Sequence, residues 1–122
     1  MKRRDIEPTT VSYAQAVEVT GATRLLFISG QTPEGEGGVV SPDFKTQYRQ
    51  VWANLEARLK AADMTFDNLV KVTIYLAEQR FLAESRGMRG EIIGDRSPAL
   101  TILVTGLVDA AWGIEIEAVA AA

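Results

Sequence analysis

The sequence predicts an α+β domain in which two helices lie on one face of a single β-sheet. The chain has 122 residues, of which 47% are hydrophobic, enough for one core. Apolar runs of strand length and two segments of helical periodicity follow in the order strand, strand, helix, strand, helix, strand, strand. Each helical segment has a single apolar stripe, so both helices should pack on the same side of the sheet. We therefore expect residues 1–122 to form one domain, with residues 1–10 as an N-terminal arm that has no clear period.

The first two predicted strands precede a long loop. Residues 14–19 alternate loosely between apolar and polar side chains, and Gly21 indicates a turn after them. Residues 24–28, RLLFI, are a continuous apolar run, which is typical of a strand covered on both faces. Glycine and proline are frequent in residues 29–38, SGQTPEGEGG, and predict a loop there.

The first helix is the clearest predicted element. Ser41 is the expected N-cap, Pro42 suits the first helical position, and the helix should end near Asp63. Its apolar side chains recur at helical spacing and form one wide stripe, made of Phe44, Tyr48, Val51, Trp52, Leu55 and Leu59. A stripe of this width predicts that the helix packs on the sheet along most of its length.

The second half of the chain alternates strands with a shorter helix. We predict a strand at 69–77, a helix at 80–93 closed by Gly94, and strands at 99–107 and 112–120. Thr73 and Tyr75 should lie on the sheet face opposite the helices, together with apolar residues of the following strand. A mixed face of this kind is too apolar for water and usually meets a partner, so we infer self-assembly through it.

No histidine or cysteine occurs in the chain, and this restricts its chemistry. Disulfides, thiolate nucleophiles, Ser-His-Asp triads and zinc sites with sulfur ligands are excluded, and no carboxylate spacing indicates a metal site. Catalysis must use carboxylates, hydroxyls, tyrosine, lysine, arginine, backbone amides and water. The net charge of −3 argues against nucleic-acid binding. No apolar run is long enough to span a membrane, so a cytoplasmic location is expected.

Two short segments are candidate sites. Glu115 and Glu117 lie on one face of the last strand, either as a solvated edge or with one carboxylate enclosed, which would raise its pKa toward the range of a general acid or base. Ser29 and Gly30 offer a hydroxyl and free backbone amides at the end of an apolar strand, where ligands are often held. The alternative for Gly30 is that it only makes a turn.

Four arginines flank or lie on the second predicted helix: Arg80, Arg86, Arg89 and Arg96. Side chains of this kind usually solvate a helix face. A single guanidinium turned inward would suffice to make a pocket for an acidic ligand.

Five segments together resemble the Rid family, also called YjgF, RidA or L-PSP endoribonuclease-like, over residues 13–120. They are SYAQAVEV, LLFISGQTP, QYRQVWANLEARLKAADMTFDNLVKVTIYLAE, which contains Asn54, RSPALTILVTGL and IEIEAVA, in this order and spacing. The resemblance implies a chorismate-mutase-like fold with a mixed sheet and two helices on one face. It also implies a homotrimer whose sheets line a central barrel, with small-molecule clefts between the subunits.

The resemblance further implies an activity. The RidA branch hydrolyses reactive enamines and imines, such as 2-iminobutanoate and 2-iminopropanoate, to a keto acid and ammonia without a cofactor. By position in the motifs, Glu117 would orient the attacking water, with Glu115 as its neighbour. Ser29 would assist it as a second catalytic residue. The implied substrate-binding residues are Tyr13, Gly30, Gln31, Ser85, Arg86, Leu100 and Ile102.

The chain departs from the RidA pattern at the position that grips the substrate carboxylate. RidA has an arginine after Pro-Ala, where this chain has Leu100, and Ile102 stands where RidA often has cysteine. Ser85 replaces an asparagine, with Arg86 next to it. Loss of a bidentate, charge-assisted contact should weaken carboxylate binding by several kcal/mol.

Three functions therefore compete at this stage. The first is hydrolysis of a neutral or bulkier enamine or imine by Glu117 and Ser29. The second is non-catalytic binding of a small metabolite or a partner protein. The third, an endoribonuclease or translation inhibitor, is least favoured because the chain is acidic and has no histidine.

Overall fold

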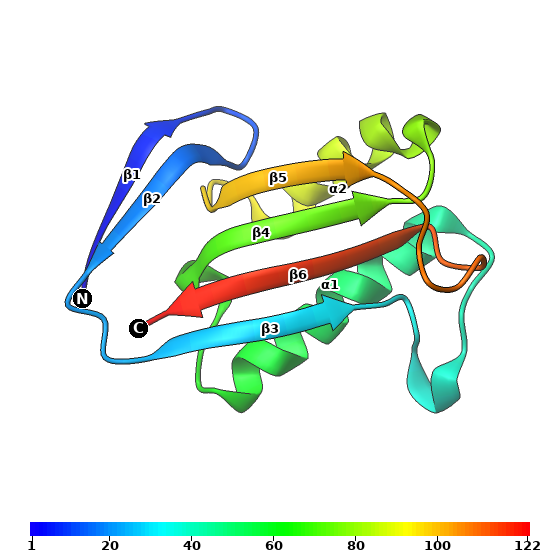
Figure 1. The fold of residues 1–122 in the computed structure, drawn as a ribbon, viewed down its shortest axis with the longest axis horizontal. Helices are drawn as coiled ribbons and strands as arrows, with labels where there is room; N and C mark the ends of the chain where they lie inside the picture. The colour runs from blue at the N-terminus through cyan, green and yellow to red at the C-terminus, as the bar shows by residue number, and fades with distance from the viewer.

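The computed structural model describes residues 1–122 and shows a six-stranded mixed sheet with two α-helices on one face (Figure 1). The strands are β1 (Lys2–Pro8), β2 (Ala14–Thr20), β3 (Leu25–Gln31), β4 (Leu69–Leu76), β5 (Ala99–Val104) and β6 (Ile114–Ala121). The helices are α1 (Phe44–Ala61) and α2 (Leu82–Ile93), and short 3-10 helices lie at Glu36–Gly38, Phe66–Asn68 and Gln79–Phe81. The predicted α+β class, with both helices on one side, is confirmed.

The strands lie in the order β1-β2-β5-β4-β6-β3. β4 and β5 are parallel, whereas β6 is antiparallel to both β4 and β3. The β1–β2 hairpin bends away from the other strands in Figure 1 and joins β5 only through the pairing of Ala14 with Ala99. β3 and β1 are therefore the two free edges of the sheet.

The N-terminal segment, expected as an arm, forms β1. It pairs antiparallel with β2 from Lys2 opposite Thr20 to Pro8 opposite Ala14. The side chain of Arg3 also reaches the rest of the sheet, donating to the backbone oxygen of Leu69 over 2.7 Å. The charged, irregular sequence of this segment does not indicate a strand. β1 therefore forms because it pairs with a neighbouring strand.

Helix α1 begins two residues later than expected. Asp43, and not Ser41, is the N-cap, because its carboxylate accepts from the backbone N–H of Thr46 over 3.0 Å. The Ser41 hydroxyl instead accepts from the backbone N–H of Asp43. The helix ends at Ala61, and Asp63 follows in a left-handed conformation with φ 56°.

The core lies between α1 and the sheet. The predicted stripe of α1 is buried in full, from Phe44 to Leu59. It packs against the inward residues of β4 and β6, which include Val72, Ile74, Ile114 and Ile116. α2 covers the other part of this face and ends at Ile93, followed by Gly94, the predicted C-cap, with φ 58°. Neither helix has the length and apolar content needed to cross a lipid bilayer.

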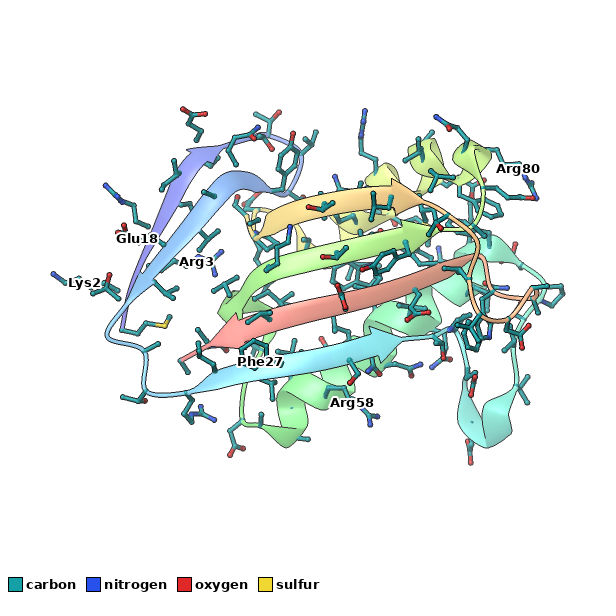
Figure 2. All side chains as sticks on the ribbon, in the orientation of Figure 1. Lys2, Arg3, Glu18, Phe27, Arg58 and Arg80 are labelled. Carbon is teal, nitrogen blue, oxygen red and sulfur yellow. The ribbon has the colours of Figure 1, made fainter.

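The opposite face of the sheet has no cover within the protomer (Figure 2). Phe27 is 74% exposed there, Leu25 58% and Leu103 48%. The strand predicted at 24–28 to be covered on both faces is therefore covered on one face only within this chain. The uncovered face, apolar in part, matches the expectation from alternation in β4.

Candidate functional site

Strand β6 carries the two candidate glutamates across the middle of the uncovered face. Ile114 and Ile116 point into the core, so Glu115 and Glu117 point away from the helices, as predicted. The pairing of β6 with β4 sets Glu117 opposite Thr73 and Glu115 opposite Tyr75.

Glu117 is held by a phenol from the neighbouring strand. The Tyr75 hydroxyl donates a 2.9 Å hydrogen bond to Oε1 of Glu117. This bond stabilises the protonated phenol beside a carboxylate, so the pKa of Tyr75 is raised above 10.0. Since Oε1 has this partner, Oε2 is the oxygen left to hold a water or a ligand.

Gly30 gives Glu115 room to lie over β3. A Cβ at position 30 would overlap Oε2 of Glu115, far closer than any real contact. Burial, reinforced by repulsion from Glu117, raises the pKa of Glu115 above its ordinary value of 4.5. The sequence offered two roles for Gly30, a turn or a ligand site. The close approach of the Glu115 carboxylate now explains why a glycine is needed there.

Gln31, another predicted binding residue, contacts its own strand. Its side chain donates to the Ser29 backbone oxygen over 3.0 Å.

A cavity of about 350 Å³, which we call the Glu117 cavity, opens on the uncovered face. Ser29 and Glu117 line it together. Its other lining residues are Phe27, Ile28, Lys71, Thr73, Ala118 and Val119. Next to it, the Lys71 ammonium donates to the Thr101 hydroxyl over 2.7 Å. A serine hydroxyl, an ammonium and a carboxylate thus surround one open space.

A second cavity, which we call the edge pocket, lies between α2, β5 and the start of β2. Its volume is about 490 Å³. Leu100 and Ile102 face the helix side because they pair in register with the inward residues Val72 and Ile74 of parallel β4. The pocket is lined by Val11, Tyr13, Gln15, Arg86, Arg89, Leu100 and Ile102.

The predicted site residues therefore fall into two separate sets. Ser29 and Glu117 line the cavity on the uncovered face, with Gly30 beside it. Tyr13, Arg86, Leu100 and Ile102 line the edge pocket on the helix side. β4 runs between β5 and β6, so one protomer does not bring the two sets together.

Ser85 belongs to neither set. It is fully buried, and its hydroxyl donates to the Tyr48 hydroxyl over 3.1 Å. In this protomer it joins α2 to α1 and has no access to either cavity.

The sequence did not place Tyr75 in a site, and it named Arg89 only as one of four arginines that could turn into a pocket. The alternation of β4 places Tyr75 on the same sheet face as Glu117, so the sequence pattern could have indicated Tyr75 as a site residue. Helical periodicity gives Arg89 no special status, and only the structure shows it 2% exposed beside the edge pocket. A third cavity, of about 470 Å³, lies between the start of α1 and residues 106–113, and of the candidate residues only Arg80 lines it. No three carboxylate side chains come close enough together to hold a metal ion.

Comparisons with known proteins agree with this fold over its whole length. The family model described as endoribonuclease L-PSP matches residues 5–122. A RutC family protein of Pyrococcus horikoshii is 36% identical over 110 residues, which cover 88% of this chain and 85% of the relative.

Solved structures of the family have the same architecture. YyfB of Yersinia pestis, a Rid-family protein of unknown function, is 30% identical, superimposes with a TM-score of 0.85, and each chain covers 100% of the other. RidA of an Antarctic Psychrobacter is 26% identical with a TM-score of 0.76, covering 94% of this chain and 93% of that one. The protein therefore has the YjgF/Rid fold. More specifically, the chain belongs to the Rid family, whose family model bears the endoribonuclease L-PSP description.

Proposed function

We propose that the protein is a homotrimeric imine or enamine hydrolase whose active site forms between subunits. The separation of the site residues carries this proposal: Ser29 and Glu117 lie on one face, and Tyr13, Leu100 and Ile102 on the other. The homotrimer that Rid-family membership implies would bring the Glu117 cavity of one protomer against the edge pocket of the next. The apolar part of the uncovered face, with Phe27 74% exposed, supports assembly through that face.

Glu117 supplies the base for hydrolysis. Its Oε2 takes a proton from a bound water while the water oxygen adds to the carbon of the C=N bond. The proton passes to nitrogen, giving a carbinolamine. Collapse of this intermediate forms the carbonyl compound and releases ammonia. The Ser29 hydroxyl donates to the substrate, and the Tyr75 hydroxyl keeps Glu117 oriented over 2.9 Å.

The edge pocket supplies the substrate walls. Leu100 and Ile102 make it apolar on the strand side, where RidA has an arginine and often a cysteine. These side chains favour a substrate bulkier than those of RidA. They also favour the alternative of a non-catalytic metabolite-binding trimer. Ribonuclease activity is the least supported, because the net charge is −3 and the chain has no histidine.

Two measurements test the proposal. Light scattering should give the mass of a trimer, and freshly generated imines of several amino acids should yield keto acid. Glu117→Gln should lower kcat/KM by about 100-fold or more, the usual contribution of a general base. Glu56→Gln, which removes a carboxylate from the exposed side of α1, is the matched control. A stable monomer, or equal activity in Glu117→Gln, would refute the hydrolase.

A further inference from the structure

Arg89 is a buried cation without a counter-ion. It lies near the end of α2 and is 2% exposed. Its Nη2 donates to the Val11 backbone oxygen over 3.0 Å, whereas Nε and Nη1 have no hydrogen-bond partner. Some arginines of the chain are in ion pairs, for example Arg3 with Asp5 and Arg96 with Asp67, but Arg89 is in none.

This environment is unfavourable for the protomer alone. Arginines are almost never fully buried unless paired, and guanidinium groups keep their proton in proteins. Burial lowers the pKa of Arg89, and the neighbouring Arg86 charge acts in the same direction. The buried donors therefore call for an acceptor that the chain itself does not supply.

The edge pocket offers a place for that acceptor. Arg89 lines it together with Arg86, which lies three residues earlier on the same side of α2 and is exposed. No acidic side chain lines the pocket. Leu100 and Ile102 form an apolar wall from β5, and Tyr13 completes the rim. Positive charge beside apolar walls fits a ligand with one anionic group and an apolar body.

The segment over Arg89 is held in a fixed conformation. Ser12 has a φ of 62°, uncommon for a residue other than glycine, and its hydroxyl donates to the Gly94 backbone oxygen over 2.5 Å. The Thr9 backbone N–H donates to the Tyr13 backbone oxygen over 2.8 Å. These bonds hold the Val11 carbonyl where it accepts from Nη2 of Arg89, so one end of the guanidinium is fixed before any ligand arrives.

We propose that Arg89 is the carboxylate-binding residue of the edge pocket, supplying from α2 the positive charge that Leu100 does not supply from β5. The ligand is a monocarboxylate with a branched or aromatic apolar body. This inference rests on the proposed function in that the edge pocket is one half of the proposed cleft. Leu100 alone led us to expect a neutral substrate. With Arg89 in the pocket, we expect an acidic one.

Calorimetric titration with two pairs of probes tests the charge requirement directly. Benzoate and isovalerate are compared with benzamide and isovaleramide, which have similar shape and no charge. Loss of a buried charge-assisted contact should weaken binding by roughly 30-fold or more, so each acid should bind at least this much more tightly than its amide. Inorganic phosphate should bind no more tightly than the amides. Equal affinity for acid and amide, or tighter binding of phosphate, overturns the proposal.

Arg89→Met tests the residue itself. A methionine keeps the length and apolar stem, and an apolar replacement of a buried charge is often neutral or stabilising, so the variant should fold. It should bind benzoate about 30-fold more weakly, whereas Arg49→Gln, which removes an exposed guanidinium from α1, should bind as before. Benzoate binding unchanged in a folded Arg89→Met variant overturns the proposal. Should that variant not fold, the acid and amide comparison on the unaltered protein decides.

The same titrations separate this inference from the proposed hydrolase. Selective acid binding without imine turnover would refute the hydrolase and leave the role of Arg89 intact. Turnover that is equal in Arg89→Met and in the unaltered protein would support the hydrolase and refute the role of Arg89.

Discussion

The two faces of the sheet use the same strands for different purposes. On β6, Ile114 and Ile116 are fully buried under α1, while Glu115 and Glu117 alternate with them and lie on the uncovered side. On β3, Ile28 is buried and Phe27 is 74% exposed. The covered face follows a simple apolar pattern and determines the fold. The uncovered face mixes carboxylates, hydroxyls and exposed apolar side chains, and we infer that it serves assembly and chemistry.

The largest predicted effect is on the oligomeric state, and it should come from a charge introduced on the uncovered face. Phe27→Glu places a carboxylate at an apolar position of the proposed interface, and a trimer repeats this change at every contact. Loss of one central aromatic residue typically costs about 2–4 kcal/mol of binding, and an unpaired charge adds to this. We expect the variant to be monomeric by light scattering at concentrations where the unaltered protein is trimeric.

Ala53→Glu is the matched control for this change. It adds the same charge at an exposed position of α1, on the helix side. The control should keep the oligomeric state of the unaltered protein. If Phe27→Glu also keeps it, the uncovered face is not the interface, and the contrast between the two faces loses its explanation.

A smaller effect is expected where the uncovered face is tightly packed. Gly30→Ala places a methyl group where Glu115 now lies, and the carboxylate must move. Overpacking of this kind usually costs about 1–3 kcal/mol in the free energy of unfolding. Denaturant unfolding measures this loss of unfolding free energy. The double variant Gly30→Ala/Glu115→Ala should recover most of the lost stability, because the clashing side chain is gone.

Gly87→Ala, on the helix side, should raise the free energy of unfolding, whereas Gly30→Ala should lower it. A Cβ at this exposed position of α2 meets nothing within 4 Å. Alanine in a helix interior is favoured over glycine by about 0.5–1 kcal/mol, so this variant should be more stable. The Gly30 prediction fails if Gly30→Ala is as stable as the unaltered protein. Glu115 would then have another position available to it.

Much of the covered face was predictable from periodicity alone. The α1 stripe and the alternation in β4 predicted which side chains are buried, since burial against one neighbour leaves a period in the sequence. The N-cap was wrong by two residues because Ser41 and Asp43 are both good caps, and only Asp43 reaches the Thr46 N–H. β1 was not predicted as a strand, because its formation depends on pairing with β2.

The arrangement of the site was less predictable. The register of β5 against β4 sends Leu100 to the helix side, and this long-range pairing leaves no local pattern that distinguishes the two cavities. Arg89 looks like any surface arginine in the sequence, and its burial depends on how the Val11 segment crosses α2. Positions set by contacts between distant segments are those that the residues alone did not reveal.

The smallest predicted effect concerns the charge of Glu115. Burial and the nearby Glu117 raise its pKa above 4.5 in the folded protein, so the folded state binds this proton more tightly than the unfolded state. The unfolding free energy therefore falls as pH rises from below 4.5 through the raised pKa. Glu115→Gln removes this buried charge and should be more stable than the unaltered protein at pH 7 by less than about 1 kcal/mol, because Glu115 is partly solvated.

The pH dependence identifies the cause of that difference. The advantage of Glu115→Gln should disappear below pH 4.5, where Glu115 is protonated in both states. Glu36→Gln, at an exposed position of the 3-10 helix Glu36–Gly38, should show no such pH-dependent difference in urea unfolding. A Glu115→Gln advantage that persists unchanged at pH 3.5 would mean that shape, and not charge, governs how this side chain lies over Gly30. The uncovered face would then be packed by the same rules as the covered one, and its carboxylates would carry no electrostatic cost.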